Sequence, residues 1–438
     1  MARTAVLGLP RVGPNRELKF ALEAFWAGRI GRAELDDVAR TLRRGGFKRA
    51  RGSGIDVIPS GDFSLYDHVL DTACALGVLD RDAYFGHARG TATRRPLEMT
   101  KWFDTNYHYL VPELVRDQRF ELDATHWTEP LREAAALGIR TRPVVVGPLT
   151  FLELAKGEKP PLPALVDVYV QLLTELAAAG ASEVQLDEPC LALDRSAYEL
   201  DAYADAFAAL AQAPVEICLA TYFAPADPRV LALPAAEVHI DLVRAPGQLS
   251  AALERVPGRL SLGVVDGRNV WTTDLDRALE RIDDAVAALG SERVTIASSC
   301  SLLHVPYEAA RETRIDPEIR PWLAFGAEKL DELALLAGGR PDRPRLRPQR
   351  VVRRPPRRAA GAGRAPGAAD DDDRLVPADA GHPRGAPRPP GRSATTWSST
   401  SASGSRASRS PSSGGCSPMA AVAWSRRSRS VTSPARNR

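Results

Sequence analysis

Cysteine is scarce in this sequence of 438 residues. The five cysteines are scattered and none forms a C-x-x-C pair, which gives no disulfide framework and fits a reducing cytoplasm. No stretch reaches the roughly 18 consecutive apolar residues of a membrane-spanning helix, and the first residues run into Arg3 and Arg11 without a long apolar segment. We therefore expect a cytoplasmic protein without a signal peptide or a membrane contact.

A strong net charge is also missing. The formal charge is +3, so no field of the whole chain favours nucleic acid. The acidic residues nearly all precede residue 341, whereas Arg, Pro, Ala, Gly and Ser dominate after it. Such a composition buries too little apolar surface to offset the entropy of ordering. We expect a folded domain over residues 1–340 and a disordered tail over 341–438, with binding of nucleic-acid phosphates by the Arg-rich tail as a separate hypothesis.

Short apolar segments alternate with helical ones up to about residue 300, which is typical of a parallel sheet covered on both faces. Eight strands would close a (β/α)₈ barrel, and about 250 residues is typical of one. Helices are expected over 65–76, 165–179, 197–213 and 274–289. Polar residues at strand ends would lie at the carboxyl rim, where such barrels keep their sites: Asp62, Asp187, Glu188, Asp241, Asp266 and Ser298. Nine strand candidates are present: 5–10, 55–59, 107–111, 144–148, 184–189, 215–222, 238–243, 260–265 and 294–298.

Residues 98–109 read EMTKWFDTNYHY and combine four aromatic rings with a lysine, two carboxylates, an amide and a histidine. The segment has no amphipathic period of a helix or a strand. Rings beside a cation suit an organic anion that has a ring system. The alternative is an aromatic core segment capped by polar groups, since buried Trp and Tyr need polar partners.

This segment and five others resemble the amino-terminal half of cobalamin-independent methionine synthase, over residues 3–337. The other segments are LGLPRVGPNRELK at 7–19, GDFSLYDHVL at 61–70, DEP at 187–189, DGRNVW at 266–271 and SSCSLLH at 298–304. The resemblance implies a (β/α)₈ barrel that faces a second one. It also implies transfer of a methyl group from 5-methyltetrahydropteroyltri-L-glutamate to L-homocysteine, giving L-methionine, without cobalamin.

The first helix is expected to begin near Arg16, with Asn15 as its cap. Helix starts attract anions, and Arg16 and Lys19 add positive charge on one face of the first turn. The resemblance implies that Arg16, Glu17, Leu18, Lys19 and Lys101 bind the glutamate tail of the folate, and Arg11 could add another cation. The alternative is a solvated first turn with an internal ion pair to Glu17.

The resemblance places a zinc ion on the second barrel, held by His, Cys, Glu and Cys, where it lowers the pKa of the homocysteine thiol. At the position that corresponds to the H-x-H-x-C segment of that barrel, this sequence reads LATYF at 219–223. Cys300 corresponds to the last zinc cysteine but lacks partners, so a buried structural thiol is expected. His68 and His108 are expected to be hydrogen-bonded scaffold, whereas for His239 and His304 both scaffold and ligand remain open. The Asp187–Glu188 pair resembles a general acid/base pair, but we expect a rim pair of carboxylates that bonds to backbone or cations. We expect no metal and no catalytic residue in this chain.

The tail over residues 341–438 has a further interpretation. Back-translated with GC-rich codons and read in other frames, residues 369–379, 393–400 and 410–424 yield segments that resemble the second barrel of the family, in family order. We therefore expect a frame-shifted tail in place of the zinc and homocysteine barrel, and a monomer that is inactive alone. The alternative function is a residual folate-polyglutamate binding module without catalysis.

Overall fold

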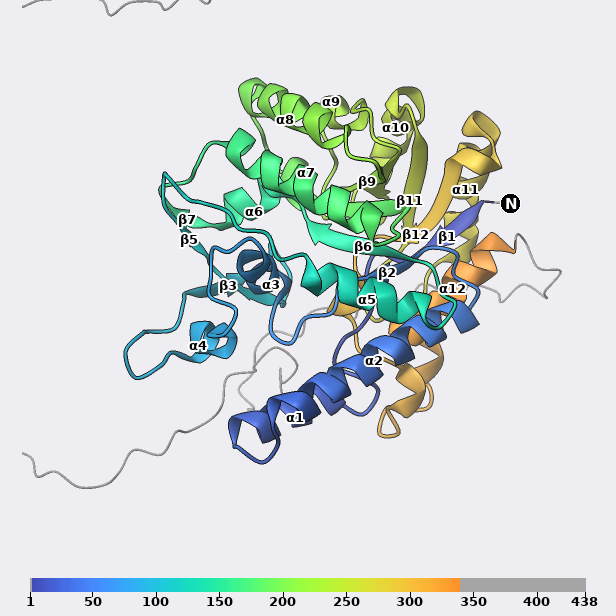
Figure 1. The fold of residues 1–438 in the computed structure, drawn as a ribbon. Helices are drawn as coiled ribbons and strands as arrows, with labels where there is room; N and C mark the ends of the chain where they lie inside the picture. The colour runs from blue at the N-terminus through green and yellow to red at the C-terminus, as the bar shows by residue number, and fades with distance from the viewer. Residues whose placement is uncertain (1, 339–438) are drawn as a thin grey trace, which may run out of the picture. The chain divides into compact units, whose positions relative to one another are not determined.

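The computed structural model describes residues 2–338, which form a closed barrel of eight parallel strands with helices around it (Figure 1). The sheet order is β1-β12-β11-β10-β9-β8-β6-β2, and a parallel bridge between Ala5 and Val57 joins its two ends. The barrel strands are β1 (Arg3–Ala5), β2 (Ile58–Ser60), β6 (Thr141–Val146), β8 (Glu183–Asp187), β9 (Glu216–Ala220), β10 (Glu237–Asp241), β11 (Arg259–Val265) and β12 (Val294–Ser298).

The helices cover the outside of the barrel, with α8, α9 and α10 on one side and α2 and α5 on the opposite side (Figure 1). Helices α2, α5, α7, α11 and α12 pack against the barrel strands, because a parallel sheet must be covered on its outer face, whereas α1 packs on α2. Their bounds are α1 (Glu17–Trp26), α2 (Arg32–Gly52), α3 (His68–Ala75), α4 (Tyr84–Arg89), α5 (Thr125–Ala135), α6 (Pro148–Leu154), α7 (Leu162–Ala178), α8 (Ala197–Leu210), α9 (Pro228–Leu231), α10 (Leu249–Arg255), α11 (Leu275–Leu289) and α12 (Gly326–Ala337).

The predicted barrel is confirmed, and eight of the nine strand candidates contribute to it. The ninth candidate, 107–111, contains β4 (His108–Leu110), which pairs antiparallel with β3 (Met99–Lys101) in a hairpin outside the barrel. A second small pair joins β5 (Glu113–Leu114) to β7 (Lys156–Gly157). The insertion between β2 and β6 therefore contains the aromatic segment that the sequence singles out.

The barrel interior is polar at the amino ends of the strands. Arg142 and Glu237 are buried there and joined by a 2.8 Å ion pair, and Arg3 reaches the same Glu237 oxygen at 2.8 Å. Gln185 accepts a hydrogen bond of 2.9 Å from Arg142. Because buried charges are tolerated only when paired and hydrogen-bonded, this network explains how a barrel core accepts arginine.

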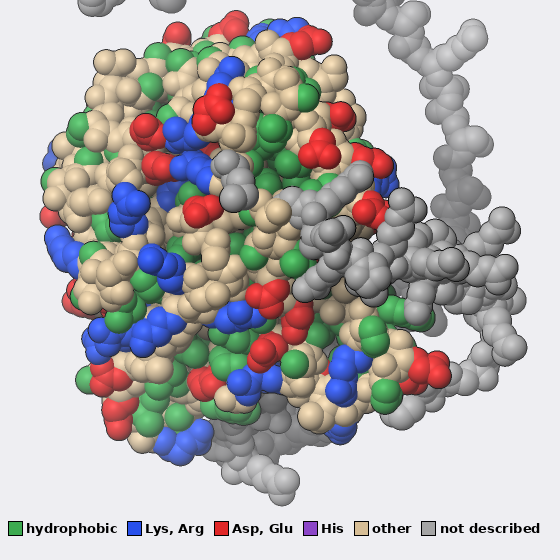
Figure 2. All heavy atoms as spheres, turned by 90° about the vertical axis from the view of Figure 1, so that its right-hand side faces the viewer, with side chains coloured by type: hydrophobic (Ala, Val, Ile, Leu, Met, Phe, Trp, Pro, Cys, Tyr) green, Lys and Arg blue, Asp and Glu red, His purple; other side chains and the backbone are tan. Residues whose placement is uncertain are grey.

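On the side of the barrel that Figure 2 shows, acidic and basic side chains are interspersed where the surface is described, without a large area of one sign. No helix among residues 2–338 is long and apolar enough to cross a membrane. The predicted boundary at residue 340 and the predicted disordered tail over 341–438 lie outside the described residues.

Candidate functional site

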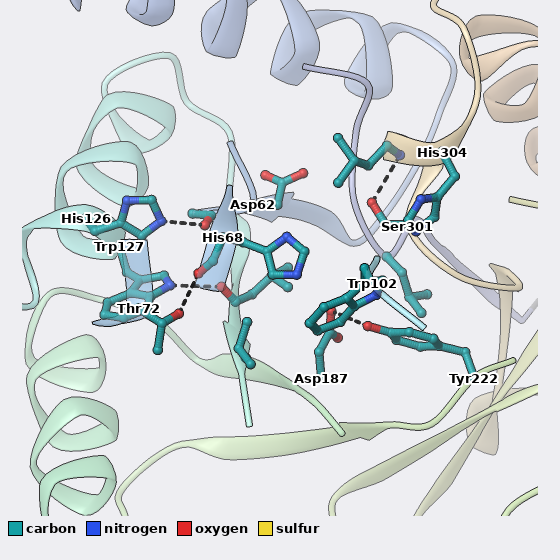
Figure 3. A pocket seen from close by; sticks show the side chains of 15 residues that line it. Asp62, His68, Thr72, Trp102, His126, Trp127, Asp187, Tyr222, Ser301 and His304 are labelled. Atoms are coloured by element: carbon teal, nitrogen blue, oxygen red, sulfur yellow. Dashed lines mark hydrogen bonds between the residues drawn. The ribbon is translucent and has the colours of Figure 1, made fainter. Parts of the chain in front are cut away.

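A small cavity opens at the carboxyl ends of the barrel strands (Figure 3). Its volume is about 40 Å³, which is room for about one water molecule. A site that encloses a drug-sized ligand has about 300–1,000 Å³, so this cavity is smaller than such a site. The polar and aromatic side chains that line it are Asp62, His68, Thr72, Trp102, His126, Trp127, Asp187, Tyr222, Ser301 and His304.

The turn after β2 shapes one wall of this cavity. Gly61 has a positive φ of 72°, and a Cβ atom there would lie 2.4 Å from the Trp127 ring. The Trp127 indole donates to the Val144 carbonyl at 2.9 Å, and His126 contacts the Gly61 carbonyl at 3.0 Å. Helix α5, which holds both side chains, is therefore joined to the ends of β2 and β6.

Two carboxyl groups face the cavity from different strands. Burial raises the pKa of Asp62 to about 6, although Leu9 N–H donates to it at 2.7 Å. Burial likewise raises the pKa of Asp187 to about 7, despite hydrogen bonds from Gln185 at 2.7 Å and Tyr222 at 3.1 Å. Both groups can therefore hold a proton near neutral pH, which is a property of general acids.

Glu188 points away from the cavity. Its oxygens accept from the backbone N–H groups of Leu149 at 3.0 Å and Thr150 at 2.7 Å, in the first turn of α6. A carboxylate at a helix start is stabilised by these N–H groups. The Asp187–Glu188 pair is thus divided between a cavity wall and a helix cap: Glu188 bonds to backbone N–H groups as expected, whereas Asp187 bonds to the side chains of Gln185 and Tyr222.

Two histidines of the mouth, His68 and His304, are neutral groups. Burial lowers the pKa of His68 and of His304 to about 3 in each case. His68 stacks on the Tyr107 ring at 5.0 Å and meets Trp102 edge-on at 4.3 Å. His239 lies inside the barrel, 2.9 Å from the Ser261 hydroxyl.

Three of the four aromatic rings of the segment 98–109 are part of the core, whereas five of its other residues are exposed. Trp102, Tyr107 and Tyr109 are buried, and each tyrosine has a polar partner: Tyr107 OH accepts from His68 N–H at 3.2 Å and Tyr109 OH donates to the Leu154 carbonyl at 3.3 Å. The interpretation of an aromatic core segment capped by polar groups fits these three rings. Trp102 alone also lines the cavity.

The structure places the predicted tail-binding residues on two elements. Helix α1 begins at Glu17, with Arg16 before it in the left-handed region at φ 61°. The prediction that Asn15 caps this helix is wrong, because its side chain donates to the Glu17 carboxylate at 2.8 Å instead of accepting from a helix N–H.

The predicted tail-binding residues differ in how far their side chains are exposed to solvent. Arg16 is exposed, Lys19 is half-buried, and Leu18 is buried against Phe63 and Leu65. Lys101 is exposed at the end of β3. Arg11 lies between the two elements, with its guanidinium 3.1 Å from the Ser64 carbonyl and 5.8 Å from the Tyr107 ring centre.

Zinc does not fit the described residues. Among residues 2–338 no three His, Cys, Asp or Glu side chains are grouped to hold a metal ion. The sulfur of Cys300 has only Ser299 Oγ at 4.0 Å and the Ser301 carbonyl at 3.7 Å as partners. Burial raises the pKa of the Cys300 thiol well above its usual value, whereas a metal ligand must be a thiolate.

The family model of the cobalamin-independent synthase N-terminal domain matches residues 3–290. The chain belongs to this family. A relative in Caulobacter vibrioides, named 5-methyltetrahydropteroyltriglutamate–homocysteine methyltransferase, is 48% identical over 383 residues, which covers 77% of this chain and 49% of the relative. A relative of the same name in Acidiphilium cryptum is 50% identical over 368 residues and is covered to 48%.

This synthase-family chain thus spans about half the length of the curated relatives that it matches. A solved B12-independent methionine synthase from Shewanella, in complex with selenomethionine, superposes with a TM-score of 0.55 at 14% identity. The match covers 77% of this chain and 97% of that one. At such low identity the likeness supports the barrel fold alone.

Proposed function

We propose that this chain is the methyl-donor half of a methyltransferase that moves a methyl group from 5-methyltetrahydropteroyltriglutamate to homocysteine. The observation that supports this most strongly is the 48–50% identity to relatives named for that reaction. Because the chain spans about half of those relatives, we further propose that it does not complete the reaction alone. We also propose that the zinc chemistry belongs to the half of those relatives that this chain does not match.

We propose that the acidic glutamate tail binds at Arg16, Glu17, Leu18, Lys19 and Lys101. The start of α1 supports this, because the positive end of the helix dipole and the two cations Arg16 and Lys19 favour an anion there. Leu18 would contribute by anchoring the helix, since its side chain is buried, and Glu17 by ordering the turn through Asn15.

Each exposed cation contributes about 0–1 kcal/mol, so binding needs several of them. Lys101→Ala is expected to weaken binding of 5-methyltetrahydropteroyltriglutamate by about two- to fivefold. Affinity should also become less sensitive to salt, because one charge contact is lost. Binding is measured by calorimetry with the full chain at low and high ionic strength.

The matched control is Arg277→Ala, which removes an exposed cation from α11 on the outer ring of helices. It should leave affinity and its salt dependence unchanged. Equal binding by the Lys101→Ala variant and the unmodified chain would remove Lys101 from the site.

Catalysis is tested separately, by supplying zinc, homocysteine and the triglutamate methyl donor and measuring methionine. We expect binding without turnover, which corresponds to a folate-polyglutamate binding module. Turnover at the rate of a complete enzyme would contradict the proposal that the chain is inactive alone.

A further inference from the structure

The tip of the β3–β4 hairpin is held over the barrel mouth by one carboxylate and two arginines. Arg268 donates from Nη1 to Asp104 Oδ1 at 2.7 Å and from Nη2 to the Asp104 carbonyl at 2.9 Å. Arg244 donates from Nη2 to Asp104 Oδ2 at 2.8 Å. Both carboxylate oxygens are therefore bound by guanidinium groups that come from the loops after β10 and β11.

The barrel positions both arginines independently of Asp104. Asp241, at the end of β10, accepts from the Arg244 backbone N–H at 2.9 Å. Asp266, after β11, accepts from the Arg268 backbone N–H at 2.7 Å, and the Arg268 guanidinium lies 5.0 Å from the centre of the Phe223 ring. The barrel therefore fixes the backbone of both arginines, and Phe223 also contacts the Arg268 guanidinium.

The backbone is strained on both sides of this contact. Phe103, directly before Asp104, has a φ of 52°, and Phe223, beneath Arg268, has a φ of 78°. Among residues 2–338 only one other non-glycine residue, Arg16, has a positive φ. Bulky residues remain in this region only where their surroundings hold them, and such strain is concentrated at binding sites and switches.

The tip also closes the cavity. Trp102 lines the cavity and is buried against His68, and Phe103 packs on Phe223 with ring centres 5.8 Å apart. Figure 3 shows Trp102 beside Asp187 and Tyr222 in the cavity wall. Movement of the tip would withdraw Trp102 and enlarge the space above the two carboxyl groups.

We propose that Arg244 and Arg268 form a binding site for a ligand carboxylate, that Asp104 fills this site in the present structure, and that an entering carboxylate displaces the hairpin tip. Arginine pairs suit carboxylates because the planar guanidinium donates two parallel hydrogen bonds. The Asp104 side chain is 56% exposed, so a ligand can reach the contact, and exposed ion pairs are weak enough to exchange. The site shares no residue with the proposed tail-binding residues.

The probe is succinate, with uncharged succinamide as its matched control, titrated calorimetrically into the full chain at low ionic strength. Asp104→Asn keeps the side-chain shape and removes the competing charge. We expect this variant to bind succinate about three- to thirtyfold more tightly than the unmodified chain, because two exposed ion pairs no longer compete. Succinamide should bind neither protein.

Two further variants separate a binding site from a structural clamp. Asp123→Asn removes the carboxylate of another exposed ion pair, with Arg81, and should not change succinate affinity. The double variant Arg244→Gln, Arg268→Gln should lose succinate binding. Equal succinate affinity in the Asp104→Asn variant and the unmodified chain, or persistence of binding in the double variant, would overturn the proposal.

Displacement of the tip is measured by amide hydrogen exchange. Trp102 N–H donates to the Tyr107 carbonyl at 2.7 Å, and Thr105 N–H to the Trp102 carbonyl at 3.1 Å. Succinate should accelerate exchange of these two amides in the unmodified chain, whereas a clamp that does not bind ligand would show no response. Arg277→Ala should leave succinate affinity unchanged. The two proposals use different residues and different probes, so failure of this one is distinguishable from failure of the tail-binding proposal.

Discussion

Replacing Arg142 by methionine tests whether the buried ion network at the amino end of the barrel stabilises the fold. The Arg142 side chain is 2% exposed and Glu237 is fully buried, with 2.8 Å between Nη1 and Oε2. The substitution keeps the apolar length of the side chain but leaves Glu237 with Arg3 alone. It also removes the donor to Gln185 Oε1.

Removing one partner from a buried ion pair costs about 3–5 kcal/mol, because the remaining charge stays desolvated. With a urea dependence of about 3 kcal/mol per molar for a chain of this size, the unfolding midpoint should fall by about 1–1.7 M. The assay is urea unfolding of the full chain at pH 7, followed by far-ultraviolet circular dichroism. The midpoint is the quantity compared, since it does not depend on a long extrapolation.

The matched control is Arg81→Met, which breaks the exposed pair with Asp123. Exposed pairs contribute about 0–1 kcal/mol, so this midpoint should fall by less than about 0.3 M. If the two variants lost the same stability, the network would contribute no more than a surface ion pair and the reasoning would be wrong.

The pH dependence of the unfolding free energy below neutral pH is a second test of the same network. Burial alone would raise the pKa of Glu237, but the charges of Arg142 and Arg3 outweigh it and hold that pKa below its usual value. A carboxyl with a depressed folded pKa stabilises the protein above its unfolded pKa, and this stabilisation is lost as pH falls through the folded pKa. Arg142→Met should therefore be most destabilising near neutral pH and less so in acid.

Two further perturbations act at the carboxyl end of the barrel. Burial raises the folded pKa of Asp187 to about 7, so its contribution to stability is present below the unfolded value of about 3.9 and is lost as pH rises through about 7. Between pH 4 and pH 8, the unfolding free energy of the Asp187→Asn variant should fall by less than that of the unmodified chain. Equal decreases would contradict the raised pKa of Asp187. Gly61→Ala should destabilise by about 2–4 kcal/mol, from left-handed strain and the clash with Trp127. Gly54→Ala, at φ 84° with open space around it, should cost only about 1 kcal/mol, and equal urea midpoints would exclude the clash.

The barrel was predictable because strand and helix segments alternate in the sequence. The candidate at 107–111 consists of residues that favour strands, and it does form a strand, so strand propensity alone did not separate it from the barrel strands. What separates them is the partner: β3 lies a short loop away, and a short loop joins antiparallel but not parallel strands. The first strand was also placed late, at 5–10 instead of Arg3–Ala5. Beyond it, Leu7 N–H binds the Ser298 hydroxyl and Leu9 N–H binds Asp62.

The cavity was predictable in part. Asp62 and Asp187 were expected at the carboxyl rim because each follows an apolar strand, and both line the cavity. Trp127 and His126 were missed, since they lie in the first turns of an amphipathic helix whose pattern does not mark them. The contacts of Asp104 with Arg244 and Arg268 were also missed, because they join residues 140 and 164 positions apart. No local pattern reports a contact at that separation.

The two ends of the barrel use charge in opposite ways. At the amino end, Arg142 and Glu237 are withdrawn from water, so their pairing cannot exchange with a ligand and contributes to stability alone. At the carboxyl end, Asp104 pairs with arginines in contact with water, beside two strained phenylalanines, so little free energy opposes exchange. The ion pairs of Asp104 at the mouth can therefore exchange with an anion while the buried network at the other end keeps the barrel folded. The difference follows from burial: an ion pair that is excluded from water stays fixed, whereas an ion pair in contact with water can be replaced by a ligand.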